Sequence, residues 1–231
     1  MFNSKYSSVL TILLIIVIVA IVAIIGYFGY EIIAEKSKEK ASESAIEQFD
    51  TAFPTVAAAD DNEVQNVSTN NETLDANVTG GNGGNNSGSN SKKVMFKGYE
   101  VIGTIRIPSV KVDEPILADV TKKSLENAVA LLYTTNGLNQ PGNSVIIGHN
   151  YRNNLFFSNN DKIKKGDSVY IKDKTGVERK YKVTDTFETS ASDADFYKPK
   201  DVNKTTVVLS TCTDDASTTN KRWIVMAELE G

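Results

Sequence analysis

Much of the carboxyl-terminal half of the chain alternates between apolar and polar positions in short runs, the pattern of half-buried strands. The runs that predict strands are residues 102–108, 110–116, 144–148, 168–172, 177–188, 206–212 and 222–227. Turns rich in Gly, Pro, Asn and Asp separate them, and residues 122–130 predict one short helix. Residues 95–231 are therefore expected to form one mainly β domain, with about eight short strands in a barrel or sandwich.

A long apolar run lies near the amino terminus. Val9 to Tyr30 contains no charged residue and is dominated by Ile, Val, Leu and Ala. A helix of this length covers about 33 Å, close to the hydrocarbon thickness of a bilayer. The alternative is a cleaved signal peptide, whose apolar core is usually only about 7–15 residues long. Residues 9–30 are therefore predicted to be a retained transmembrane helix in contact with membrane lipid, preceded by a short tail, residues 1–8.

The segments after this helix differ in composition. Residues 31–53 are charged and rich in alanine, which predicts that the helix continues as a polar stalk. This stalk is interpreted as a solvated helix without a partner. Residues 54–94 are dense in Asn, Gly and Ser with almost no large apolar residue, so they are expected to be a disordered tether. The positive-inside rule leaves the orientation open, because lysines lie on both sides of the span.

Composition narrows the functional classes. The chain has 231 residues, a net charge of -4, one cysteine and one histidine. Mild acidity gives no support for a nucleic-acid partner, which usually needs a basic patch. A single cysteine excludes a disulfide within the chain and leaves either a buried structural thiol or a functional one. One thiol and one imidazole are too few for a tetrahedral zinc site, so neither a metal nor another cofactor is expected.

Three side chains capable of acyl-transfer chemistry lie where predicted strands meet loops. Cys212 ends the strand 206–212, Arg222 opens the next strand, and His149 directly follows the apolar run 144–148. A thiolate is a strong nucleophile, an imidazole transfers protons near neutral pH, and a guanidinium offers fixed donors to an oxyanion. Because two consecutive strands can pair, Cys212 and Arg222 are expected to be close to each other.

These residues also form recognisable motifs. Leu209-Ser210-Thr211-Cys212, followed ten residues after the cysteine by Arg222, resembles the Leu-x-Thr-Cys…Arg signature of sortases. Gly148-His149-Asn150 resembles the histidine segment of that family, and residues 103–108 resemble its first core strand. The resemblance covers roughly residues 99–229.

The resemblance implies an eight-stranded β-barrel cysteine transpeptidase on the outer face of a Gram-positive cell membrane, with a single-pass anchor and a cytoplasmic tail. Its substrates would be secreted proteins with a carboxyl-terminal sorting signal, and its acceptor an amine of a peptidoglycan precursor. Cys212 would form a thioester, His149 would act as acid and base, and Arg222 would bind the signal and stabilise the oxyanion. The backbone near Thr211 would assist.

The same resemblance makes the loop 189–199, with Phe196 and Tyr197, the region that contacts the sorting signal. Asp193 and Asp195 in this loop are candidates for calcium, but a solvated polar loop is the preferred interpretation. The lack of a second hydrophobic segment at the carboxyl end and of an Asp-Pro-aromatic lid argues against the pilus-polymerising class.

Two alternatives remain open at this point. The same thiol and imidazole would also serve a thiol peptidase that only hydrolyses its substrate. A membrane-anchored binding domain with a structural cysteine is the other alternative, and it requires no chemistry at Cys212.

Overall fold

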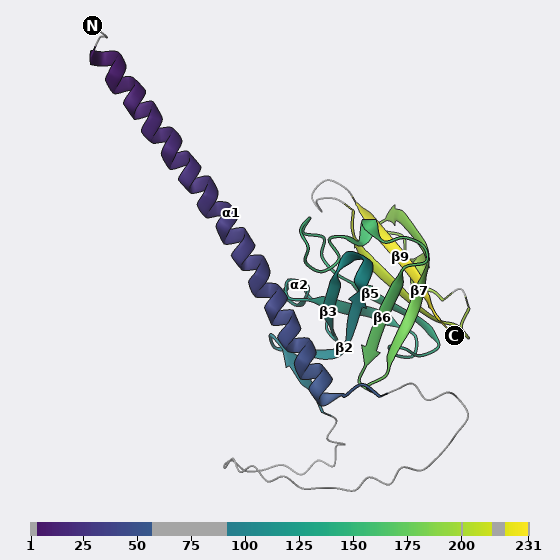
Figure 1. Cartoon of the computed structure of the whole chain (residues 1–231). Coiled ribbons are helices and arrows are strands. Elements are labelled where there is room, and N and C mark those ends of the chain that lie inside the picture. Colours follow the sequence, from purple (N-terminus) through teal and green to yellow (C-terminus); the bar gives the residue numbers. More distant parts are fainter. Residues whose placement is uncertain (1–3, 57–91, 200, 214–219, 231) are drawn as a thin grey trace, which may run out of the picture.

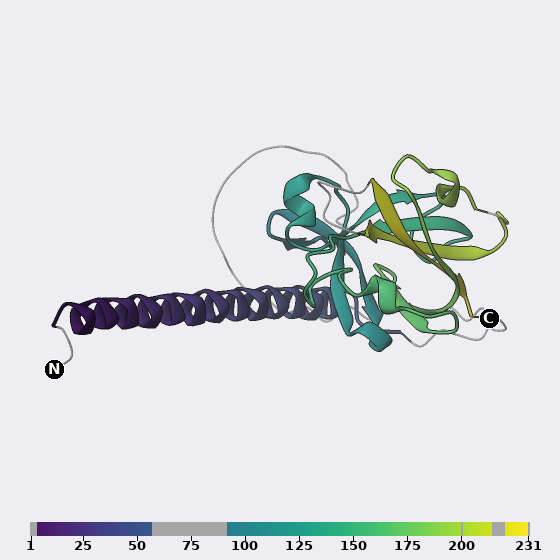
Figure 2. The same cartoon turned by 90° about the horizontal axis from the view of Figure 1, so that it is seen from above.

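The structure is a computed structural model that describes residues 4–56, 92–199, 201–213 and 220–230. A long helix runs along one side of a barrel of strands and extends far beyond it (Figures 1 and 2). Most of the tether predicted for residues 54–94 lies outside the described residues.

Within the residues that the structure describes, nine strands form a single sheet. They are β1 (Val94–Phe96), β2 (Tyr99–Ile107), β3 (Val112–Leu117), β4 (Val129–Thr134), β5 (Gly142–Ile147), β6 (Ser168–Asp173), β7 (Glu178–Ser190), β8 (Thr205–Cys212) and β9 (Lys221–Leu229). The order is β1-β2-β3-β4-β5-β8-β9-β7-β6, and β2 also pairs with β6. That pairing closes β2 to β9 into a barrel of eight strands, with β1 as a short extension beside β2. The predicted mainly β, eight-stranded barrel is confirmed.

The helices are few and mostly short. Besides α1 (Ser4–Ala52), the structure describes α2 (Lys122–Leu125) and the 3-10 turns η1 (Pro108–Val110), η2 (Asn160–Lys162) and η3 (Asp195–Tyr197). The helix predicted for residues 122–130 ends early, because Val129 and Ala130 pair with Ile116 and Leu117 of β3. The last residues of the predicted helix therefore belong to β4. The apolar pattern of the sequence did not show that a strand begins there.

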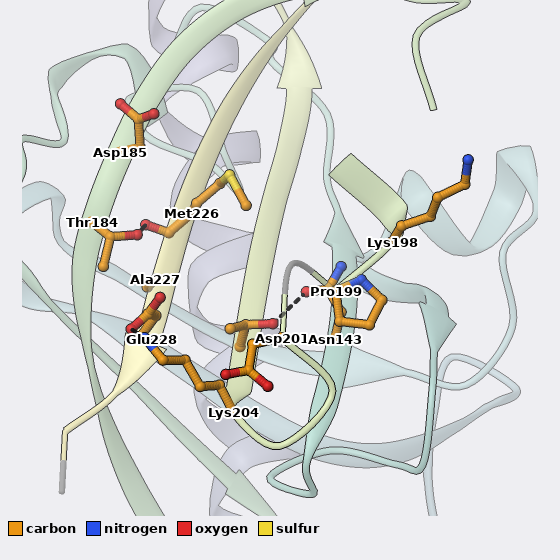
Figure 3. A pocket seen from close by; sticks show the side chains of 11 residues that line it. Asn143, Thr184, Asp185, Lys198, Pro199, Asp201, Lys204, Met226, Ala227 and Glu228 are labelled. Carbon is orange, nitrogen blue, oxygen red and sulfur yellow. Dashed lines mark hydrogen bonds and ion pairs between the residues drawn. The ribbon is translucent and has the colours of Figure 1, made fainter. Parts of the chain in front are cut away.

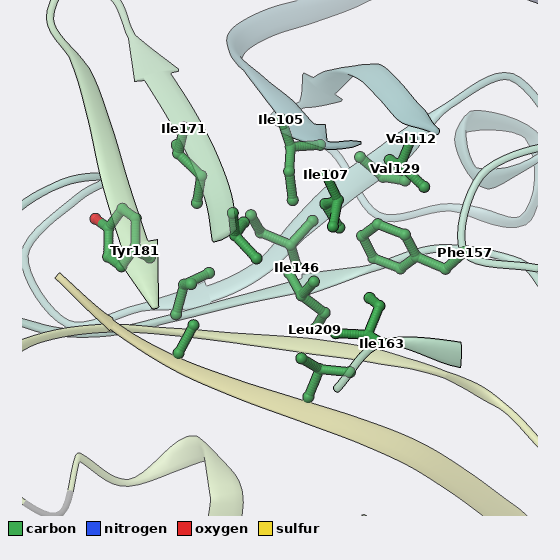
Figure 4. Close-up of a cluster of buried hydrophobic side chains, with 14 of the residues drawn as sticks. Ile105, Ile107, Val112, Val129, Ile146, Phe157, Ile163, Ile171, Tyr181 and Leu209 are labelled. Carbon is green, nitrogen blue, oxygen red and sulfur yellow. The ribbon is translucent and has the colours of Figure 1, made fainter. Parts of the chain in front are cut away.

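The barrel encloses one apolar core (Figure 4). Ile105, Ile146, Ile171 and Leu209 from four different strands are at most 1% exposed, and Tyr181 closes the same cluster. Burying a large apolar side chain contributes about 1.5–3 kcal/mol, so this cluster is the main source of barrel stability.

Strand β8 is buried on both faces. Leu209 faces the inner core, whereas the adjacent Val208 joins an outer cluster with Val145 of β5, Ile224 of β9 and Phe196 of η3. Successive side chains of a strand point to opposite faces, so the loop that carries η3 covers the outer face of β8. This cover gives β8 rigid support on both sides.

Helix α1 has two environments along its length. From Leu10 onward its first half is apolar and exposed, and it is long and apolar enough to cross a membrane. Its last turns instead pack on the barrel, where Ala45 is 2% exposed and Phe49 is fully buried. Their partners are Val94, Phe96, Val101, Leu117, Ala128 and Ala130. The prediction of a solvated stalk without a partner is therefore wrong, because every third or fourth residue of this stretch is small or apolar and fits the barrel surface.

Polar contacts reinforce this packing. The hydroxyl of Ser42 donates to a carboxyl oxygen of Glu114 in β3 at 2.7 Å, and both side chains are buried. The Lys172 ammonium of β6 donates to Asp50 at 2.8 Å and to Thr55 at 2.9 Å. The helix therefore contacts β1, β2, β3 and β6 rather than a single strand.

We expect Phe49→Ala to weaken the docking of α1 by about 3 kcal/mol or more, because a fully buried ring is removed and a cavity remains. Trypsin cleavage of the stalk, residues 31–53, is then faster than in the wild type. Gln48→Ala, at an exposed position of the same turn, is the control. Equal cleavage rates for both variants would contradict the packing.

We also expect stability to depend on the protonation of Glu114, whose pKa burial raises to about 8. The native state then holds a proton that the unfolded chain has released, so stability falls as pH rises from about 4.5 to about 8. Glu114→Gln removes this titration while keeping the shape. As pH rises, the melting temperature of the wild type should fall relative to that of Glu114→Gln. The variant Glu43→Gln, at an exposed position, should show the same pH dependence as the wild type. Parallel curves for the wild type and Glu114→Gln would refute this prediction.

Candidate active site

The predicted pairing of the last two strands is present, and it brings Cys212 and Arg222 together. In the antiparallel register of β8 and β9, Cys212 lies directly opposite Arg222. The thiol is free and half-buried. The Arg222 side chain donates to the carbonyl of Lys221 at 3.0 Å, which occupies one of its five N–H donors.

His149 reaches the same end of the barrel through β5. Strands β5 and β8 are parallel and their register ends at Ile147 opposite Ser210. The N–H of Gly148 continues the ladder to the Ser210 carbonyl at 3.3 Å. His149 therefore follows the last bonded residue of a strand that lies directly beside β8.

Two side-chain bonds join the histidine segment to the strand of the cysteine. Thr211 Oγ1 donates to the Gly148 carbonyl at 2.9 Å, and Asn150 Nδ2 donates to the Cys212 carbonyl at 2.9 Å. The residues on either side of His149 are thus each bonded to β8. Thr211 and Asn150 fix the backbone positions of the imidazole and the thiol relative to each other.

Gly148 is required by the packing behind His149. A Cβ at this position would lie 2.9 Å from Phe157 Cδ2 and 2.9 Å from Val129 Cγ1, closer than real contacts allow. The buried Phe157 ring thus lies against the backbone just before His149, and the Phe157 N–H donates to the His149 carbonyl at 3.2 Å. The glycine lets the loop fold tightly onto the strand end.

The environment of His149 favours its neutral form. The imidazole is half-buried, and burial lowers its pKa. The nearby Glu126 carboxylate opposes this shift, whereas Lys38 and Lys122 add to it. The Tyr151 ring lies 4.9 Å away, centroid to centroid. A neutral imidazole can accept a proton, as a general base must.

A hollow of about 230 Å³ lies beside the thiol. Its lining includes Cys212, Asn150 and Trp223, together with the carboxylate residues Asp161 and Glu188. Glu188 forms an ion pair with Lys221 at 2.5 Å. The thiol therefore borders a space that a small part of a substrate can enter.

The remaining residues predicted to contact substrate lie in different settings. Thr211 is 4% exposed and bonds inward, so its side chain is committed to the protein. Phe196 packs in the outer cluster, and its carbonyl and that of Tyr197 accept bonds from Asn143 Nδ2. The outer cluster centres on Val208, four residues before Cys212, or about 13 Å along the strand. A role of this loop in binding the sorting signal stays a prediction.

A larger hollow of about 390 Å³ lies at the other end of β8 and β9 (Figure 3). Lys204, Thr206, Glu228 and Asn143 line it. Thr206 is six residues before Cys212, about 20 Å along the strand, so this hollow is remote from the thiol.

Sequence reasoning missed several residues that build the site. Asn150 stands directly after His149 in the quoted triplet, but only the fold reveals that its amide reaches the Cys212 carbonyl. Glu126, the residue directly after α2, and Lys38 of α1 influence the imidazole although both are distant from it in the sequence. Nothing in the local pattern indicates these two contacts.

Comparison with known proteins identifies the family of the chain. The sortase domain profile matches residues 105–230, more than half of the chain. Sortase A of Bacillus anthracis is 32% identical over 133 residues, which cover 57% of this chain and 61% of that protein. Sortase A of Listeria monocytogenes is 27% identical over 131 residues, covering 56% and 57%. The match thus spans about three fifths of the length of these relatives.

Solved structures give the same result. The Sortase D5 transpeptidase of Clostridium perfringens matches with a TM-score of 0.50 and 32% identity, covering 57% of this chain and 79% of that one. Sortase A of Corynebacterium diphtheriae matches with a TM-score of 0.51 and 30% identity, covering 58% and 62%. Because A and D types match equally well, the fold does not separate the subclasses. The barrel, the motifs and these matches together establish that the chain belongs to the sortase family.

Proposed function

We propose that this protein is a cysteine transpeptidase that joins secreted proteins to an amine of a peptidoglycan precursor. One observation carries the proposal: His149, Cys212 and Arg222 stand at the same end of the adjacent strands β5, β8 and β9. Asn150 and Thr211 tie the histidine segment to the cysteine strand. Such a set of thiol, imidazole and guanidinium suits acyl transfer.

In the first half-reaction, the imidazole of His149 takes the thiol proton and the Cys212 sulfur attacks a carbonyl carbon of the sorting signal. The guanidinium of Arg222 stabilises the oxyanion of the tetrahedral intermediate. When the peptide C–N bond breaks, the imidazolium gives its proton to the leaving amine. The products are a thioester on Cys212 and a released carboxyl-terminal peptide.

In the second half-reaction, an acceptor amine attacks the thioester carbonyl carbon. His149 takes a proton from this amine, the C–S bond breaks and the thiolate leaves. The thiolate then regains that proton from the imidazolium. One peptide bond has replaced another, so neither water nor an oxidant is consumed.

The proposed location is the outer face of a Gram-positive cell membrane, where secreted substrates and peptidoglycan precursors are found. The exposed apolar half of α1 supports a single membrane anchor. The orientation, with residues 1–8 in the cytoplasm and the barrel outside, is proposed from the substrates. The exclusion of the pilus-polymerising class stays a prediction.

The nucleophile is tested with the full chain in detergent and a library of sorting-signal peptides, with and without triglycine as the amine. We expect the wild type to form an acyl-enzyme on Cys212, detected by mass spectrometry, and a ligated product when triglycine is present. Cys212→Ala should lower the cleavage rate by at least about 10³-fold. Processing at the wild-type rate by Cys212→Ala would favour the binding-domain alternative. Cleavage without any ligated product would favour a hydrolytic peptidase.

The bond from Thr211 to the Gly148 carbonyl is tested with Thr211→Val. Because a hydrogen bond contributes about 0.5–1.5 kcal/mol, its loss should lower the acylation rate by up to about 10-fold through misalignment of the two strand ends. Thr211→Ser keeps the hydroxyl and should retain most of the activity. If the valine variant acylates as fast as the serine variant, this bond does not align the site.

A further inference from the structure

The segment after His149 has an unexpected neighbour, the helix that leads to the membrane. We name residues 150–159 the histidine loop; it lies between His149 and η2. Glu35 and Lys38 of α1 contact it directly, and Ser42 is linked to it through Glu114 of β3. These three helix residues are three and four positions apart, so they lie on one face of the helix.

Two of these residues contact the loop directly. The Glu35 carboxylate accepts a bond from the Asn154 N–H at 3.1 Å. The Lys38 ammonium lies 5.2 Å from the centre of the Tyr151 ring and 5.9 Å from that of Phe156, within the range of cation–π attraction. Backbone and aromatic side chains of the loop are therefore both held by α1.

The third contact passes through Glu114. Ser42 donates to this buried carboxyl group, which also accepts the backbone N–H of Phe156. Phe156 is 1% exposed and has a φ of 53°, a left-handed conformation that is costly for a bulky residue. A strained, buried residue of this kind persists only where its surroundings hold it, and Glu114 and Lys38 are part of those surroundings.

The loop in turn contacts the Cys212 backbone and the His149 ring. Asn150 bonds the Cys212 carbonyl, and the Tyr151 ring lies 4.9 Å from the His149 ring, tilted by 37°. The Tyr151 ring also lies 5.8 Å from that of Phe156. A continuous set of contacts therefore runs from Lys38 through Tyr151 to His149.

We propose that the membrane-proximal part of α1 belongs to the catalytic apparatus, with Glu35, Lys38 and Ser42 as positioning residues for His149. This inference rests on the proposed acid–base function of His149. The helix acts on the imidazole in two ways: it packs the histidine loop, and it brings the positive charge of Lys38 toward the ring. Glu126 and Lys122 are the other charged groups that act on the imidazole.

The arrangement also sets the height of the site above the membrane. Glu35 and Lys38 follow Tyr30, the last residue of the predicted span, by five and eight residues. At about 1.5 Å per residue, the histidine loop is held about 8–12 Å along the helix from the membrane boundary. The histidine loop therefore contacts α1 on the side nearer the predicted span, since Glu35 and Lys38 precede Phe49 along the helix.

The test uses the full chain in lipid nanodiscs, purified without a histidine tag. Because His149 is the only histidine, labelling with ¹³C-histidine gives one signal whose pH titration reports on this imidazole alone. The variants are Lys38→Met, which removes the charge, and Lys38→Arg, which keeps it. Lys40→Met, at an exposed position of the same helix, is the matched control.

We expect Lys38→Met to raise the pKa of His149 and to lower the kcat of Cys212 acylation about 3- to 10-fold, with little change in KM. Lys38→Arg and Lys40→Met should both keep the His149 pKa and the kcat of acylation close to their wild-type values. Ser42→Ala should lower kcat as well, whereas exposed Ser44→Ala should not.

The proposal is overturned if Lys38→Met and Lys40→Met give the same titration curve and the same kcat. A fall in kcat that Lys38→Arg does not rescue, with an unchanged titration, would also overturn it. Failure of the wild type to acylate Cys212 would instead refute the proposed function. The titration of His149 needs no activity, so the two failures are distinguishable.

Discussion

The hydrogen-bond register of β8 is the constraint on which the site depends. This strand is bonded along its length to β5 on one side and to β9 on the other, and apolar clusters cover both of its faces. A shift of one residue would exchange the two faces of the strand. The side chains that now pack in the outer cluster would then point into the barrel interior. Because Val208 and Leu209 fit different clusters, such a shift is strongly disfavoured, and Cys212 is held opposite Arg222.

The sequence predicts the pairing of Cys212 with Arg222 but not the position of His149, and the reason is topological. Two antiparallel strands joined by a short loop are neighbours by local geometry. The parallel pairing of β5 with β8 joins segments about 60 residues apart, which no local pattern specifies. His149 was a candidate because it follows a predicted strand, but only the resemblance to sortases indicated that it would lie with Cys212 and Arg222. Strand β4 was missed for a related reason, since pairing with β3 and β5 decides its conformation.

The docking of α1 shows a different limit of sequence reasoning. The signal was present, because Ala41, Ala45, Phe49 and Phe53 recur every four residues along the stalk. Alanines give a weak apolar stripe, and the surrounding Glu and Lys residues make the segment look solvated. This stripe packs on a surface built from β1, β2, β3 and β4, and that surface exists only once the barrel has closed. The tertiary surface, not helix propensity, therefore decides the environment of this helix.

Connectivity makes this docking favourable. The predicted tether joins the helix to β1, so docking is intramolecular and occurs at an effective concentration of about millimolar. At that concentration, contacts worth more than about 4 kcal/mol keep the helix mostly docked. Burial of Phe49 alone supplies about 1.5–3 kcal/mol, and the bonds of Ser42 and Asp50 add to it. Docking therefore fixes the barrel to the same helix whose first half is long and apolar enough to cross a membrane, so the position of the barrel is set by α1.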